Sequence, residues 1–147
     1  MYICGIDIGK FHHEASIIDE TGRLVSKSLR FTNTTDGGEK LMNYLNLHNP
    51  KGEVMVFGME STGHYWLSLY CFLFDQGFQV NVINPLQSDA VRNLFLRKTK
   101  SDAKDSFLIA ETIRIGRFSS TDLPSEDVLC LRQLCRHRMD QIGRAHV

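Results

Sequence analysis

Four acidic residues of this chain stand where a fold could bring their carboxylates together. Asp7 follows an apolar segment at the N-terminus, and Glu60 ends a second, continuous apolar run. Asp102 and Asp105 are three residues apart at the start of a predicted helix, so we expect both on one helical face. In open α/β sheets, sites form beyond the carboxyl ends of strands. The four acids therefore predict one cluster.

A cluster of four carboxylates favours a particular chemistry. Mg²⁺ prefers hard oxygen ligands, and without a cation the acids would repel one another and some would stay protonated. Two such ions about 4 Å apart can activate a nucleophile and stabilise the leaving oxygen in phosphoryl transfer. We therefore predict that the four acids are catalytic and bind Mg²⁺, or Mn²⁺ in its place.

Each acid also has an ordinary explanation when it is taken alone. Asp7 could be a turn residue, and Glu60 and Asp102 could be acids at helix N-termini. Asp105 could be a solvated partner of Lys104 or Lys98. The joint pattern, with an acid after each of two strands and a pair at a helix start, favours the metal site.

Basic side chains gather near the third acid. They are Arg92, Arg97, Lys98, Lys100 and Lys104, and Lys10 follows the first acid by three positions. Phosphate neutralisation by lysine and arginine is the main source of sequence-independent affinity for nucleic acid. We predict that these six residues contact nucleic acid, without distinguishing RNA from DNA. The alternative is a solvated basic loop that balances nearby acids.

Histidine and aromatic residues follow the second acid. His64 could orient a ligand or a phosphate, or it could be an ordinary surface histidine. Tyr65, Trp66 and Tyr70 could stack nucleobases, although their spacing is more typical of helix packing.

Hydrophobic patterning predicts the elements that position these residues. Strands are expected at 2–8, 13–18, 24–31, 54–59 and 78–83, and helices after 35 and at 61–76, 87–96 and 102–115, with a loop at 97–100. Three strands with tight connections predict an antiparallel meander, and the segment 54–83 predicts a βαβ unit. The order βββαβαβαα therefore predicts an α/β fold, with a mixed sheet flanked by helices.

The composition is that of one globular domain. The chain has 147 residues, 42% of them hydrophobic, and a formal net charge of zero. Neutrality argues against a tail-driven nucleic-acid binder but allows a local basic patch. The four cysteines form no CxxC pair and are expected to be free thiols in a reducing cytosol. No apolar stretch approaches the roughly 20 residues of a membrane helix, so a cytoplasmic protein is expected.

The end of the chain has a different character. We expect residues 1–117 to form the domain with the acids, and residues 118–141 to form a linker and the start of a helical, coiled-coil-like connection. Residues 142–147 break the helical pattern and are interpreted as a tail foreign to the native protein.

Four motifs carry a family resemblance. They are Gly5-Ile-Asp-Ile-Gly-Lys10, Met59-Glu-Ser-Thr-Gly-His-Tyr-Trp66, Val82-Ile-Asn-Pro85 and Lys98-Thr-Lys-Ser-Asp-Ala-Lys-Asp105. In this order they resemble the N-terminal domain of the DEDD transposases of bacterial insertion sequences. That domain is RuvC-like, that is, ribonuclease-H-like. The resemblance covers residues 2–141 and implies a five-stranded mixed sheet whose four acids bind magnesium.

The resemblance also implies a function. Members of the family are recombinases that cleave and transfer DNA strands and are guided by a structured bridge RNA. A second, C-terminal domain supplies a catalytic serine in them, and no residue here can be assigned to that role. We therefore expect DNA and a guide RNA as partners, and a homo-oligomer for the full-length protein.

Three alternatives remain open at this point. The isolated chain could bind RNA or DNA without turnover, or act as a RuvC-like magnesium nuclease. A phosphotransferase of the actin and sugar-kinase type also begins with an apolar strand and Gly-x-Asp-x-Gly. Such proteins are usually much longer and carry glycine-rich phosphate loops, which this sequence lacks.

Overall fold

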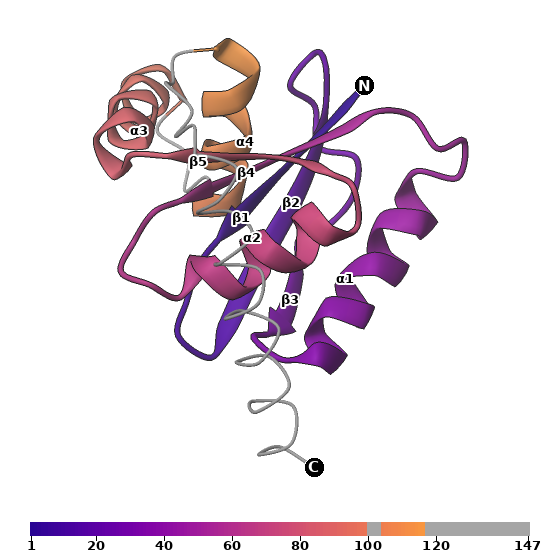
Figure 1. The fold of residues 1–147 in the computed structure, drawn as a ribbon. Coiled ribbons are helices and arrows are strands. Elements are labelled where there is room, and N and C mark those ends of the chain that lie inside the picture. The colour runs from indigo at the N-terminus through magenta and orange to yellow at the C-terminus, as the bar shows by residue number, and fades with distance from the viewer. Residues whose placement is uncertain (100–103, 117–147) are drawn as a thin grey trace.

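The computed structural model describes residues 1–99 and 104–116, with only the backbone described at 95–99. Its elements follow the predicted order (Figure 1). They are β1 (Tyr2–Asp7), β2 (His12–Asp19), β3 (Leu29–Thr32), α1 (Thr35–His48), β4 (Met55–Glu60), α2 (Trp66–Asp75), β5 (Gln79–Ile83), α3 (Pro85–Thr99) and α4 (Asp105–Ile115).

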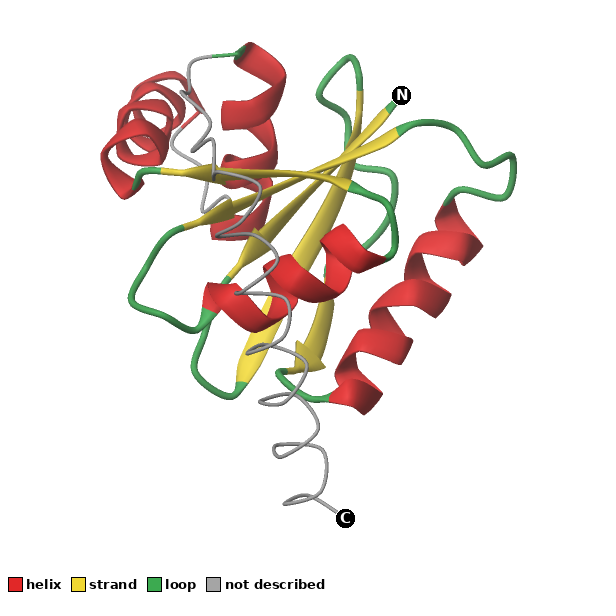
Figure 2. Ribbon diagram, in the orientation of Figure 1, coloured by secondary structure: helices red, strands yellow, loops and turns green. Residues whose placement is uncertain are grey.

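The strands form one five-stranded sheet in the order β3-β2-β1-β4-β5 (Figure 2). Strand β2 is antiparallel to both β1 and β3, whereas β4 is parallel to both β1 and β5. The predicted meander followed by a βαβ unit is therefore confirmed. Because β1, β3, β4 and β5 all run the same way, their carboxyl ends lie along one edge of the sheet.

Alternation along the strands sorts side chains onto two faces. Cys4 and Ile6 of β1 and Phe57 of β4 join one core cluster, which includes apolar residues of α1 and α2. Ile3 of β1 and Val56 of β4 join the other cluster, with the apolar side of α4. The sheet thus has an α1/α2 face and an α4 face, and helices cover both in Figure 1.

Two glycines let α4 lie directly on its face. Gly5 and Gly58 are register partners in the parallel pair β1/β4. A Cβ built on Gly5 would stand 2.1 Å from the Ser106 carbonyl oxygen and 2.5 Å from the Ala110 nitrogen, and one on Gly58 would stand 2.5 Å from Ile113. Any larger residue would displace the helix, so this pair of glycines sets where α4 begins relative to the sheet.

Several predicted boundaries were wrong. Strand β3 is shorter than predicted, and Leu24 makes only an isolated bridge to Ile18. Helix α2 begins at Trp66 rather than near residue 61, because a turn with Gly63 at a φ of +60° comes first. Residues 97–99, predicted to be a loop, continue α3.

The start of the last helix also needs correction. Helix α4 begins at Asp105, and Lys104 before it is extended, with φ −64° and ψ 147°. The predicted start of this helix at residue 102 was therefore wrong, and the shared face of Asp102 and Asp105 stays a prediction. Asp102 itself lies outside the described residues.

Other expectations stand as follows. Cys4 and Cys71 are buried and form no disulfide, as predicted. Cys130, Cys135, the segment 118–141 and the tail 142–147 lie outside the described residues. Within the part of the chain that the structure describes, no helix combines the length and apolar character needed to span a membrane.

The glycine pair gives a first prediction. Gly5→Ala should lower the free energy of unfolding by about 3 kcal/mol, because the new Cβ meets helix backbone that cannot rotate away. Urea denaturation measures the loss. Gly52→Ala is the control, since nothing lies within 4 Å of its Cβ position and only its φ of +64° costs energy, about 1 kcal/mol. If Gly5→Ala lowered the free energy of unfolding no more than Gly52→Ala, the close contact between α4 and the sheet at Gly5 would be contradicted.

Candidate functional site

Three acids share the α4 face at the carboxyl edge of the sheet. Asp7 is two residues after Gly5 and Glu60 two residues after Gly58, so strand alternation points both side chains toward α4. The last register pair of β1 and β4 immediately precedes them, which puts the two acids side by side. Glu14 of β2 is the register partner of Asp7 and lies on the same face. Sequence reasoning missed Glu14, and only the hairpin register identifies it.

Helix α4 brings a further carboxylate to this face. Asp105 is its first residue, and its neighbour Ser106 is buried with its Oγ 2.6 Å from Ser16 Oγ of β2. This contact and the close approach of α4 to Gly5 hold the start of α4 against β1 and β2. The charge of Asp105 therefore stands near the strand-end acids.

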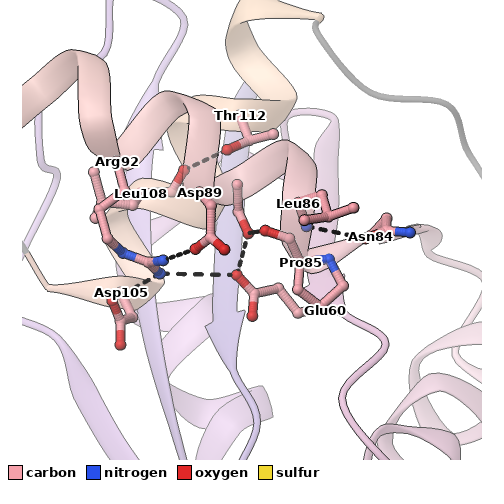
Figure 3. Close-up of polar contacts among 10 residues, drawn as sticks. Glu60, Asn84, Pro85, Leu86, Asp89, Arg92, Asp105, Leu108 and Thr112 are labelled. Atoms are coloured by element: carbon pink, nitrogen blue, oxygen red, sulfur yellow. Dashed lines mark hydrogen bonds and ion pairs between the residues drawn. The ribbon is translucent and has the colours of Figure 1, made fainter.

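Arginine 92 of α3 links the acids (Figure 3). Its Nη2 lies 3.0 Å from Asp105 Oδ1 and 3.9 Å from Glu60 Oε1. Its Nη1 donates to Asp89 on the same helix. Ser88, also on α3, donates from its Oγ to Glu60 Oε1. One guanidinium thus holds carboxylates from β4, α3 and α4.

The start of α3 is what orients this group. Pro85 opens the helix, where its missing N–H costs nothing. Asn84 precedes it, and its Oδ1 accepts from the Leu86 nitrogen at 2.9 Å. Ser88 and Arg92 follow about one and two turns later, on the side that faces β4 and α4. Sequence reasoning missed Ser88 and Asp89, although their spacing to Arg92 on a predicted helix was a usable signal.

A second cation acts on the β2 side. Lys104 Nζ lies 2.6 Å from Glu14 Oε1 and 2.7 Å from Ser28 Oγ, and Ser28 donates to the same carboxylate at 2.7 Å. These hydrogen bonds hold the pKa of Glu14 below its usual value. Lys104, predicted to contact nucleic acid, is therefore paired with an acid in this structure.

Among the described residues Asp7 has no such cationic partner at hydrogen-bond distance, and its protonation is affected. Partial burial raises its pKa to about 6, and the negative charges of Asp105, Glu60 and Glu14 add to the shift, while Arg92 opposes it. The first, second and fourth acids of the predicted set are thus close enough to repel one another.

The donor chemistry fits a divalent metal ion. Carboxylate oxygens are the ligands that Mg²⁺ prefers, and a cation would relieve the repulsion on Asp7. Among residues 1–99 and 104–116, however, no three histidine, cysteine, aspartate or glutamate side chains form a ready-made ligand group. Arg92 pairs with two of the acids instead, so the described carboxylates must draw closer together to share an ion.

The remaining predicted contacts are placed only in part. Lys10 is exposed after β1, with its Nζ 5.1 Å from the centre of the Phe11 ring. Arg97 and Lys98 lie in α3, with their side chains outside the described residues, and Lys100 is not described at all. Their role in binding stays a prediction.

Comparison with known proteins finds matches along most of the chain. A family model described as a transposase, of the DEDD type and named for IS110, matches residues 4–146. A protein of Streptomyces coelicolor that is named as a mini-circle transposase for IS117 is 29% identical over 142 residues. An insertion element IS116 protein of Streptomyces clavuligerus is 29% identical over 140 residues. Each match covers 95% of this chain and 34% of the relative, so the chain spans about a third of the length of these relatives.

Solved structures show the same fold. RuvC of Thermus thermophilus superposes with a TM-score of 0.55 at 14% identity, covering 82% of this chain and all of that one. RuvC of the same organism in complex with a Holliday junction gives 0.52, and the fowlpox virus resolvase with junction DNA gives 0.50 at 18% identity and 78% of this chain. The expected RuvC-like fold is therefore confirmed.

The shifted pKa of Asp7 gives a second prediction. Because the folded pKa of about 6 lies above the ordinary value of 3.8, ionisation of Asp7 opposes folding, and stability falls as pH rises from about 4 through 6. Asp7→Asn cannot ionise. In EDTA at pH 7.5 it should melt a few degrees above wild type, and the difference should vanish near pH 4.

The matched control is Asp19→Asn, for which the expected change in stability has the opposite sign. Hydrogen bonds from Thr21 and from the Arg23 backbone lower the pKa of Asp19, so Asp19→Asn should lose stability at pH 7.5. Melting curves between pH 4 and 8 measure both variants. If Asp7→Asn melted below wild type at pH 7.5, the carboxylate repulsion inferred here would be wrong.

Proposed function

Because this chain belongs to the DEDD transposase family of the IS110 type, matched over residues 4–146, we propose that it forms the metal-dependent active site of a DNA transposase or recombinase. The proposed site comprises the four acids Asp7, Glu60, Asp102 and Asp105. One observation carries the proposal. Strand alternation and the seat of α4 bring three of these acids to one edge, where Arg92 already bonds two of them.

The proposed cofactor is Mg²⁺, or Mn²⁺ in its place. A bound divalent ion would supply nucleophile activation and stabilisation of the leaving oxygen in phosphoryl transfer. Ser88 holds one oxygen of Glu60 and so sets the direction of the other. Asp7 carries a proton below about pH 6 and offers a full carboxylate above it. Arg92 keeps the acids together before an ion binds.

The proposed substrate is DNA. Structural neighbours hold Holliday junctions, which makes branched DNA the first substrate to test. Six basic residues are proposed to contact phosphates, namely Lys10, Arg92, Arg97, Lys98, Lys100 and Lys104. For the full-length protein we propose a structured guide RNA, a homo-oligomer and a serine from a further domain, supported by family membership alone.

A second candidate is a nucleic-acid-binding module without turnover. It is favoured by the lack of a ready-made three-ligand group among the described residues and by the engagement of Arg92 with Glu60 and Asp105. Under this reading the arginine is the permanent counter-ion of the acids, and no metal is required.

Cleavage assays separate the two candidates. In Mg²⁺ or Mn²⁺ the chain should nick a branched DNA, and Asp7→Asn, Glu60→Gln and Asp105→Asn should each reduce the rate at least about 100-fold. Glu39→Gln, an exposed acid on α1, is the control and should cut like wild type. Binding in EDTA without cleavage by wild type in either metal would instead favour the binding module for this chain taken alone. Cleavage that survives Asp102→Asn would remove that residue from the site.

Arg92 gives a further prediction. Without its guanidinium the acids repel one another, so Arg92→Gln should lose about 1 kcal/mol of stability in EDTA. With this competitor gone, Mg²⁺ affinity should rise about fivefold, since about 1.4 kcal/mol corresponds to tenfold. Thermal melting across a Mg²⁺ titration reports both quantities.

The control for Arg92 is Arg114, which forms a separate ion pair within α4. Arg114 Nε and Nη2 bind Glu111 at 2.7 and 2.8 Å, far along the helix from Asp105. Arg114→Gln should lower stability without changing the response to Mg²⁺. Weaker Mg²⁺ binding by Arg92→Gln would show that the arginine supports the ion rather than competing with it.

A further inference from the structure

A cavity lies on the sheet face opposite the acids, at the same edge. Its volume is about 660 Å³, within the roughly 300–1,000 Å³ usual for small-ligand pockets. It opens between the β1–β2 hairpin, the start of α1 and the turn before α2. None of the described site acids, Asp7, Glu60 and Asp105, lines it. The lining residues are Lys10, Phe11, His12, Thr32, Asn33, Thr34, Asp36, His64, Tyr65 and Ser68.

The walls of this cavity carry aromatic rings. Phe11 is 62% exposed, which leaves a large apolar ring open to solvent at the tip of the hairpin. Across the cavity the rings of His64 and Tyr65 lie 4.4 Å apart, tilted by 36°. Exposed flat rings are the common platform on which proteins stack unpaired nucleobases.

The backbone around these rings is held in place. The Asn33 nitrogen donates to the Phe11 carbonyl at 2.8 Å, which ties the hairpin to the segment before α1. The Gly9 nitrogen donates to Nδ1 of buried His13 at 3.2 Å. Trp66 Nε1 donates to the Gly63 carbonyl at 3.1 Å and closes the turn that carries the other two rings. A preformed frame loses little entropy when a ligand enters.

The polar groups favour a base over a phosphate. Thr34 Oγ1 is committed to the Gly37 nitrogen and to Thr32, but the exposed Asp36 carboxylate can accept from an exocyclic amine. That carboxylate would repel a phosphate. Lys10 alone among the described lining residues carries a permanent positive charge, and it stands beside the Phe11 ring.

We propose that this cavity binds one unpaired, amine-bearing nucleobase of a nucleic-acid strand, stacked against Phe11, while Lys10 contacts the adjoining phosphate. The inference rests on the proposed function insofar as that function makes nucleic acid the substrate. A paired base stays inside its duplex, so the site selects single-stranded or branched regions.

Fluorescence anisotropy in EDTA tests the proposal without using the metal site. The probe is a labelled 12-nucleotide mixed-sequence strand, as DNA and as RNA, compared with the same sequence as a duplex. Phe11→Ala should weaken single-strand binding about tenfold and leave duplex binding unchanged. Leu47→Ala, which removes a 73% exposed side chain near the far end of α1, should change neither. The strand type that shows the Phe11 effect identifies the source of the base.

The location is checked by nuclear magnetic resonance. Titration with adenosine monophosphate should shift the amide signals of Phe11, Asn33 and Tyr65, and ribose 5-phosphate, which lacks the base, should not. Equal single-strand affinity of wild type and Phe11→Ala, or equal losses on single strand and duplex, would overturn the base pocket and leave the proposed function intact. If wild type bound no strand of any kind, nucleic acid as substrate would fall as well.

Discussion

The close contact between α4 and the sheet is the constraint on which the rest of the site depends. Gly5 and Gly58 are paired across two parallel strands, and their missing side chains leave room for the backbone of α4 at Gly5 and for the Ile113 side chain of α4 at Gly58. The helix start is thereby fixed beside the strand ends. Asp105 reaches the neighbourhood of Asp7 and Glu60 because two glycines two residues earlier leave room for the helix.

That contact brings several carboxylates together, and their mutual repulsion is neutralised at some of them but not at others. Glu14 is neutralised by Lys104, and Glu60 and Asp105 share Arg92, but Asp7 is left with mainly repulsive neighbours. A fold selected for stability alone would replace such an acid. Its cost is understandable if a cation joins the group during function, since the same repulsion then becomes attraction to that cation.

Sequence reasoning recovered the parts that depend on short-range pattern. Apolar runs ending in Asp7 and Glu60 identify strand ends, and parallel strands bring their carboxyl ends to one edge. It failed where tertiary contacts decide. The extended backbone at Lys104 puts the start of α4 at Asp105 rather than at residue 102, and Ser88 matters only because α3 packs beside β4. Residues 97–99 were predicted to be a loop because they are polar and basic, whereas they form the last residues of the helix that begins at Pro85.

The two faces of the sheet share one edge, and strand alternation together with the connecting loops divides their chemistry. Along β1 and β4, residues facing α4 end in acids, and the loops that leave the same strands carry Lys10, Phe11, His64 and Tyr65 to the other face. The proposed metal site and the proposed base cavity therefore lie at the same edge of the sheet. Under these two proposals, a nucleic-acid strand that crosses the edge exposes its backbone to the acids while a neighbouring base turns into the cavity. The bend that this requires is easiest where bases are already unpaired, so the two proposals together predict a preference for branched DNA over continuous duplex.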